Sequence, residues 1–200
     1  MPRSKEEFKA ITDERRNSIL AAALKLFAIR GYDSVSVDHI THAAKCSHGL
    51  FYHYYRSKAD LFQNLVKLIH ERWLVLIQDI NFQQEPVELL QDITDFYIDQ
   101  LKAGDYEAYV LYLFLTFHLQ KNLPHYEHDH VNPKKGPFKA FPDVVREGQE
   151  KGLFLDLDVE ELARVYYATL EGLAYNRIYQ GKRGFKNVDS SIIVNMFIKK

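Results

Sequence analysis

The chain is short of the residues that disulfide frameworks, cysteine zinc clusters and membrane spans require. Cys46 is its single cysteine among 200 residues, so neither an intrachain disulfide nor a cysteine zinc cluster is possible, which suits a reducing compartment. No apolar run approaches the roughly 18 residues that cross a bilayer, and the first residues lack the hydrophobic segment of a secretory signal. These absences predict a cytoplasmic protein with no membrane contact.

The familiar signatures of enzymes are missing as well. There is no glycine-rich phosphate loop, no Gly-x-Ser-x-Gly elbow and no pair of carboxylates at a spacing typical of acid and base catalysis. Four histidines, His118, His125, His128 and His130, suggest a metal site but form no His-x-x-x-His pair, and a solvated acidic loop is the favoured interpretation. We expect no catalytic activity, no cofactor and no metal.

Charge is nearly balanced over the whole chain, with a formal net charge of -1, but it is unevenly distributed. Residues 1–60 hold ten Lys and Arg against seven Asp and Glu, whereas the remainder holds sixteen against twenty. A basic excess favours an anionic partner such as nucleic acid, although three surplus charges are a weak indication alone.

Apolar residues recur at helical spacing along most of the chain, and no stretch alternates as a strand would. Residues 1–11 are expected to form a loosely ordered arm. The predicted helices run over about 13–30 with Thr12 as N-cap, 36–44, 47–54, 58–81, 87–103, 106–121, 138–151, 159–180 and 190–198. The fold class is therefore all-α: a helical N-terminal domain over 12–72, joined by a long helix to a larger C-terminal helical domain over 73–200.

Residues 36–55 have the pattern of a helix-turn-helix, whose second helix enters the major groove of DNA. Ser36 and Ser47 are N-cap candidates for its two helices. Gly49 costs about 1 kcal/mol of helix propensity relative to alanine, which an approach of the backbone to DNA would justify. Tyr55 is assigned to the core, and Lys45 in the turn needs a left-handed backbone. The predicted DNA-contacting residues are Ser36, Val37, Ser47, His48, Gly49, Leu50, Tyr52, His53, Tyr54 and Lys58.

This stretch and its flanking helices resemble the DNA-binding domain of TetR-family transcriptional regulators. The resemblance rests on the segments Phe27-Ala28-Ile29-Arg30-Gly31-Tyr32, Ser36-Val37-Asp38-His39-Ile40-Thr41, Ala44-Lys45-Cys46-Ser47 and Phe51-Tyr52-His53-Tyr54-Tyr55-Arg56-Ser57-Lys58. Thr41, Lys45, Cys46 and Phe51 depart from the family's usual Ala, Gly, Val and Leu. The resemblance implies phosphate contacts by Tyr52 and Lys58, and groove contacts around Ser47, His48, Leu50, His53 and Tyr54.

The resemblance further implies a homodimer that reads a palindromic operator and releases it when a small molecule binds the C-terminal domain. The last two helices of the family form the dimer interface, which here predicts Leu162, Tyr166, Leu170, Leu173 and Ile178 with Gly172 allowing close approach. An aromatic-rich middle region is compatible with an apolar or aromatic effector and suggests a pocket of Tyr97, Tyr109, Tyr112, Phe114, Tyr167 and Tyr175.

The sequence thus predicts a dimeric, ligand-responsive transcriptional regulator, with repression as the expected sign. One alternative of another class stays open: a helical protein that binds a metal or a small molecule and uses its N-terminal helices only for assembly. Salt-dependent binding to a palindromic duplex would separate the two.

Overall fold

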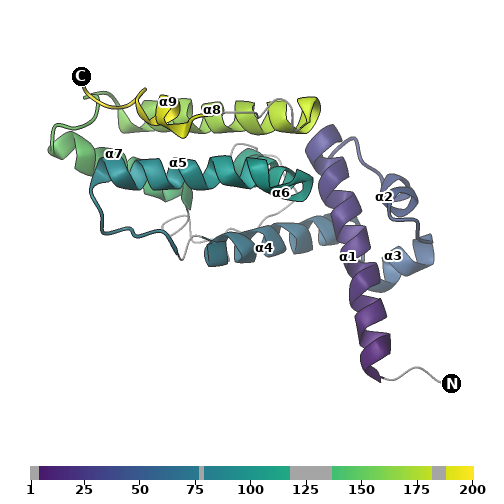
Figure 1. Ribbon diagram of the computed structural model, residues 1–200. Helices are drawn as coiled ribbons and strands as arrows, with labels where there is room; N and C mark the ends of the chain where they lie inside the picture. The colour runs from purple at the N-terminus through teal and green to yellow at the C-terminus, as the bar shows by residue number, and fades with distance from the viewer. Residues whose placement is uncertain (1–4, 77–78, 118–136, 182–187) are drawn as a thin grey trace. The chain divides into compact units, whose positions relative to one another are not determined.

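A computed structural model describes residues 5–76, 79–117, 137–181 and 188–200, and every element of regular structure within them is a helix. The helices, shown in Figure 1, are α1 (Lys5–Arg30), α2 (Val37–Ala43), α3 (His48–Tyr54), α4 (Lys58–Leu76), α5 (Pro86–Ala103), α6 (Asp105–Phe117), α7 (Pro137–Glu150), α8 (Val159–Gln180) and α9 (Ser190–Val194). The predicted all-α fold class is confirmed. Within the described ranges, no helix has both the length and the apolar composition needed to cross a bilayer.

Two compact units make up the chain, and the division falls inside α4, between Leu68 and Ile69. The first unit holds α1, α2, α3 and the first part of α4, and the second holds the rest of α4 with α5 to α9.

The core of the first unit forms where the apolar faces of its four helices meet. Phe27 of α1 and Phe62 of α4 are buried, and their rings meet edge to face with centroids 5.5 Å apart. Tyr32, just after α1, adds a third ring 4.7 Å from Phe62. Ile40 of α2 and Phe51 of α3 are both fully buried, so each helix of the helix-turn-helix is held by an apolar anchor of its own.

The second unit is organised around α5, which contacts α6, α7, α8 and α9, while α6 also contacts α8 (Figure 1). Two stacked ring pairs mark its core. Trp73 of α4 stacks on Phe114 of α6 with centroids 4.5 Å apart, and Phe141 of α7 stacks on Tyr166 of α8 at 4.2 Å. Large buried rings supply most of the apolar area that stabilises such a unit.

Arg177 of α8 is a buried cation that joins three helices of the second unit. Its Nε donates to the carbonyl oxygen of Leu101 at the end of α5, 2.9 Å away, and a terminal nitrogen lies 2.8 Å from the carboxylate of Asp105 at the start of α6. The guanidinium is only 2% exposed. One side chain thus satisfies a helix C-terminus and pairs with a charge at the next helix N-terminus.

Three predicted helix ends are wrong. The helix predicted over 58–81 ends at Leu76, and residues 79–81 are not α-helical. The first helix begins at Lys5 instead of Asp13, so there is no arm over residues 5–11 and Thr12 is not an N-cap. Lysine, glutamate and alanine before Thr12 have high helix propensity and continue the helix through that cap-like pattern. The last helix ends at Val194 instead of residue 198, because the chain turns back there and pairs Phe154 with Ile198.

Candidate nucleic-acid interface

Both helices of the helix-turn-helix begin at the predicted serine caps. Ser36 Oγ accepts a hydrogen bond from the backbone N–H of His39 at 3.2 Å, and the backbone N–H of Ser36 donates to His39 Nδ1 at 3.2 Å. This is a capping box in which histidine replaces the usual Glu or Gln. Ser47 Oγ accepts from the backbone N–H of Leu50 at 3.1 Å. Since each hydroxyl accepts these bonds, its own hydrogen remains a possible donor to an outside group.

The turn between the two helices has the backbone that its sequence predicts. Lys45 has a φ of 51°, in the left-handed region that glycine favours. The backbone N–H of Lys45 donates to His42 O at 3.2 Å, and that of Cys46 donates to Thr41 O at 2.9 Å. The turn therefore keeps its shape without glycine because two hydrogen bonds hold it.

The exposed face of α3 carries polar and aromatic groups next to a glycine. His48, Gly49 and His53 are exposed, and Tyr52 is 56% exposed although the preceding Phe51 is fully buried. Leu50, Tyr54 and, on α2, Val37 are partly buried. The predicted core assignment of Tyr55 is confirmed, since it is 1% exposed.

Gly49 has no internal reason to be glycine. Its φ is not positive, and a Cβ placed on it would meet only Ser47 Oγ, at an ordinary van der Waals distance of 3.9 Å. Neither backbone conformation nor packing within the chain excludes a side chain here. The space above Gly49 is open to an outside partner.

Lys58, at the start of α4, is engaged inside the first unit. Its ammonium donates to the carbonyl oxygen of Tyr32 at 2.8 Å and lies 4.1 Å from the centre of the Tyr32 ring. An ammonium has three donors, so this bond leaves two hydrogens for another acceptor. Sequence reasoning missed this link, although the Gly31-Tyr32 pair that forms it belongs to the recognised motif.

Asp38 is a second residue that sequence reasoning missed. Its Oδ1 lies 2.9 Å from Nε2 of His48, which joins the first turn of α2 to the first residue of α3. The two side chains are 77% and 56% exposed. The imidazole that was predicted to face the groove is therefore held in place by a carboxylate from the neighbouring helix.

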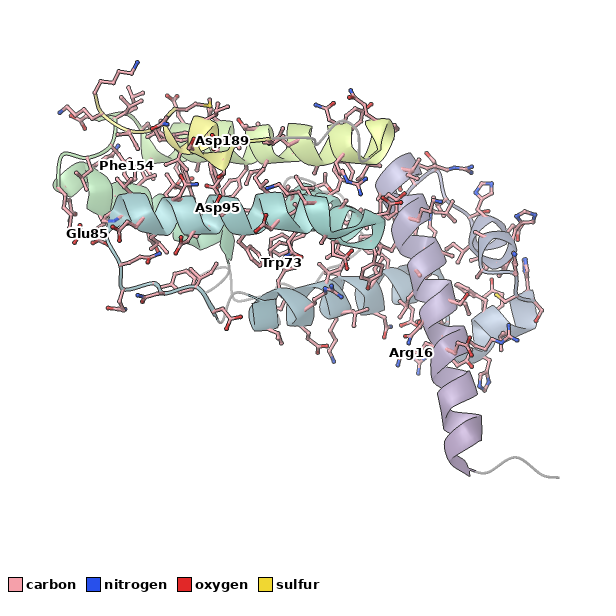
Figure 2. All side chains as sticks on the ribbon, viewed as in Figure 1. Arg16, Trp73, Glu85, Asp95, Phe154 and Asp189 are labelled. Atoms are coloured by element: carbon pink, nitrogen blue, oxygen red, sulfur yellow. The ribbon has the colours of Figure 1, made fainter. Side chains whose placement is uncertain are left out.

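The predicted pocket residues fall into more than one group in the second unit. Tyr97 and Phe114 both contact Trp73, whose place between α4 and α5 is labelled in Figure 2. Among the described residues, neither Trp73 Nε1 nor the Tyr97 hydroxyl has a hydrogen-bond partner, although both are buried. An unpartnered buried polar group is costly, so these two atoms are candidates for contact with a bound molecule.

Other predicted pocket residues lie on α6 and α8. Burial and the nearby negative charges of Glu171, Tyr179 and Tyr175 raise the pKa of Tyr112. Burial likewise raises the pKa of the Glu171 carboxyl. Burial also raises the pKa of Tyr109 and of Tyr167. Tyr112 is thus close to Tyr175, and Tyr167 is close to Tyr97.

Three of the predicted dimer-interface residues are buried in the core of the protomer. Leu162, Tyr166 and Leu170 are buried, and the Tyr166 hydroxyl lies 3.0 Å from Thr94 Oγ1 of α5. Their apolar and hydroxyl groups are already used inside the chain. Leu173 and Ile178 are partly buried.

A different stripe of α8 is exposed. It consists of Val165, Ala168, Gly172, Tyr175 and Tyr179, spaced alternately by three and four residues, and we call it the α8 stripe. Side chains at this spacing lie along one face of a helix. At its centre, a Cβ on Gly172 would meet nothing within 4 Å.

No metal site takes shape in the part of the chain that the structure describes: no three His, Cys, Asp or Glu side chains come together there. His118, His125, His128 and His130 lie outside the described residues, so the predicted loop is not placed.

Comparison with known proteins points in the same direction as the fold. A sequence profile described as "Bacterial regulatory proteins, tetR family" matches residues 19–65. An uncharacterized HTH-type transcriptional regulator, YuxN of Bacillus subtilis, is 32% identical over 103 residues, which cover 46% of this chain and 35% of the relative. The HTH-type transcriptional repressor NicS of Pseudomonas putida is 26% identical, with 72% of this chain and 68% of the relative covered.

Solved structures extend the likeness to the whole chain. A HlyIIR mutant protein superposes with a TM-score of 0.70 over 100% of both chains at 17% identity. The ketosteroid transcriptional regulator KstR2 of Mycobacterium tuberculosis has a TM-score of 0.64 at 20% identity and covers 93% of this chain and 96% of its own. At these identities the likeness concerns the fold.

The fold and the matches define an all-helical protein with an N-terminal helix-turn-helix of the bacterial regulator type. Residues 19–65 match the model of the TetR family. The matched segment spans about a third of the length of the first curated relatives, 35% in each case, so likeness to them is concentrated in the first unit. Relatives of this chain are transcriptional regulators or repressors by name.

Proposed function

We propose that this chain is a homodimeric transcriptional repressor that binds a palindromic DNA operator and is released by a small-molecule effector. It acts in the cytoplasm, where its DNA target lies, and has no catalytic activity. DNA binding belongs to about residues 12–72, which include the helix-turn-helix of the first unit, and effector binding and dimerisation belong to residues 73–200. The observation that carries the proposal is the exposed face of α3, with an unhindered glycine among hydrogen-bonding side chains.

The face of α3 suits DNA because each of its groups matches a feature of the duplex. Gly49 lets the helix backbone approach closely, and His48 and His53 supply imidazole groups that can reach base edges or phosphates. Tyr52 is 56% exposed, and its hydroxyl can donate to a phosphate oxygen. Ser36, Val37, Ser47, Leu50 and Tyr54 complete the proposed contact surface.

Lys58 supplies the positive charge of this surface. Tyr32 holds its ammonium at the N-terminus of α4, where the helix dipole also favours an anion. Because one of the three ammonium hydrogens bonds to Tyr32, a phosphate would receive one of the other two. Tyr32 thereby restricts the lysine side chain before DNA arrives, which lowers the entropy lost on binding.

Dimerisation is assigned to the α8 stripe and not to the buried residues that the sequence suggested. Val165, Tyr175 and Tyr179 expose large apolar surface, and Ala168 and Gly172 allow another helix to approach. Leu173 and Ile178, which are partly buried, would lie at its border. A second copy of the same stripe is the partner that a twofold operator requires.

An apolar or aromatic effector is assigned to the second unit. Trp73, Tyr97 and Phe114 offer ring surface, and Trp73 Nε1 and the Tyr97 hydroxyl offer two unpartnered polar atoms. Tyr109, Tyr112, Tyr167 and Tyr175 remain proposed contacts. Binding there would favour one arrangement of the protein over another and so lower its affinity for DNA.

Binding to DNA is tested with the full chain and Lys58→Ala. A duplex selected from a random pool and a scrambled duplex of equal length serve as probes, over a series of salt concentrations. Lys58→Ala should weaken binding to both duplexes by a similar factor and reduce the salt slope by about 1, because a phosphate contact is independent of sequence.

The matched control is Lys200→Ala, which removes the same charge from the second unit and should leave binding unchanged. Thermal unfolding of Lys58→Ala shows whether the lost bond to Tyr32 has disturbed the fold. Equal binding by Lys58→Ala and the unmodified chain would contradict the phosphate role, and no salt-dependent DNA binding by the unmodified chain would contradict the proposed function.

A further inference from the structure

The contact between Asp38 and His48 lies at the edge of the proposed DNA surface. Asp38 is in the first turn of α2, His48 is the first residue of α3, and the two helices are in contact (Figure 1). Oδ1 and Nε2 are 2.9 Å apart, a normal hydrogen-bond distance. Both side chains are more than half exposed, so the pair is accessible to an outside partner.

The chemistry of this contact decides which nitrogen of His48 carries a hydrogen. An ionised carboxylate only accepts hydrogen bonds, so Nε2 must be the protonated nitrogen. A neutral imidazole has one N–H, and therefore Nδ1 is left as a bare acceptor. The carboxylate of Asp38 thus selects the tautomer of the histidine ring as well as its orientation.

Stability alone gives little reason for the pair. An exposed pair of this kind contributes only about 0 to 1 kcal/mol. Moreover, a carboxylate on a surface that faces phosphates lowers the affinity for DNA. The position of Asp38 is explained if the pair increases the discrimination between bases.

We propose that Asp38 is a positioning residue that makes His48 recognise an exocyclic amino group in the major groove. A bare Nδ1 accepts a hydrogen bond from cytosine N4 or adenine N6, whereas guanine and thymine present acceptors, O6, N7 or O4, to an amino-acid side chain at those positions. Held with Nε2 as the donor to Asp38, His48 therefore prefers cytosine or adenine at one position of each half-site. This inference rests on the proposed DNA-binding function.

The test compares base preferences of the full chain, Asp38→Ala and His48→Ala. Each protein selects duplexes from a random pool at pH 8, and the bound sequences are counted. The unmodified chain should enrich cytosine or adenine at one half-site position. Both variants should lose about tenfold of the discrimination at that position and keep the preferences elsewhere, and the double variant should lose no more than either one.

A second readout separates positioning from general damage. Asp38→Ala removes a negative charge, so its affinity for a scrambled duplex should stay the same or rise while discrimination falls. Asp33→Ala is the matched control because Asp33 is another exposed acid of the first unit, and its removal should leave every base preference intact.

Three results would overturn the inference. One is an Asp38→Ala profile identical to that of the unmodified chain, and another is a uniform loss at all positions. The third is a preference for guanine or thymine at the position sensitive to His48. If the unmodified chain selects no sequence at all, the proposed function itself fails, and the inference fails with it.

Discussion

Gly49 of α3 and Gly172 of α8 differ from Gly148 of α7 in what surrounds them. A Cβ on Gly148 would lie 2.0 Å from Cδ2 of the buried Phe154, so packing inside the chain demands glycine there. At Gly49 and Gly172 no such neighbour exists. Glycine weakens a helix, so a helical glycine without an internal cause indicates a surface that another molecule approaches.

The surroundings of Gly49 and Gly172 also differ in chemistry. Next to Gly49 stand imidazoles and a phenol hydroxyl, which suit a polar, charged partner. Next to Gly172 stand Val165, Ala168 and Tyr175, which suit an apolar helix face. The same residue type therefore suits two kinds of approach, which we propose are to DNA in the first unit and to a second copy of the chain in the second.

The largest effect is expected for Gly148→Ala. The added methyl group would overlap the Phe154 ring and force it out of a close-packed site, which should lower the free energy of unfolding by about 3 kcal/mol. Urea unfolding measures this loss. Glu150→Ala, at an exposed position of the same helix, should change it little. If Gly148→Ala loses as little stability as Glu150→Ala, then Gly148 is not required by packing and does not differ from Gly49 and Gly172.

Gly49→Ala should have the next largest effect, on DNA binding. The affinity for the selected duplex should fall about tenfold, or by about 1.4 kcal/mol, because a methyl group separates the helix from the DNA. The free energy of unfolding should rise by about 1 kcal/mol, since alanine is the better helix former. Binding isotherms and urea unfolding give the two numbers. Undiminished DNA binding would show that Gly49 is not a point of close approach.

Gly172→Ala should have the smallest effect of the three, on the dimer. The dissociation constant of the dimer should rise about fivefold, or by about 1 kcal/mol, since the α8 helices of two copies would be held farther apart. Sedimentation over a dilution series measures it. Gln180→Ala, exposed on α8 but off the face that carries the α8 stripe, is the matched control. Equal dissociation constants for both variants would place the dimer interface elsewhere.

Local signals in the sequence predicted the helix-turn-helix well. The caps at Ser36 and Ser47 and the left-handed Lys45 follow from short-range backbone chemistry, which depends on neighbours in sequence. The capped helices start where the serines place them. The predicted start of the first helix was wrong because a plausible cap at Thr12 lies inside a longer stretch with high helix propensity.

Contacts between residues that are far apart in the chain could not be predicted from the sequence. On α8, Tyr166 and Tyr175 are the same residue type in the same apolar helix, yet one is buried and the other is 47% exposed. Which face turns inward depends on where α5 and α7 lie, and periodicity alone does not say. The bonds of Lys58 to Tyr32 and of Asp38 to His48 likewise join separate elements.

The hydrogen bonds of Arg177 have a consequence for how the second unit opens. The same guanidinium binds the last turn of α5 and the first turn of α6, so neither helix end can fray while α8 stays in place. The three segments are thereby tied into one cooperative opening unit, and their backbone amides should exchange with solvent at a common rate. The side chain of Arg177 therefore makes the end of α5, the start of α6 and α8 the smallest unit that opens in this region.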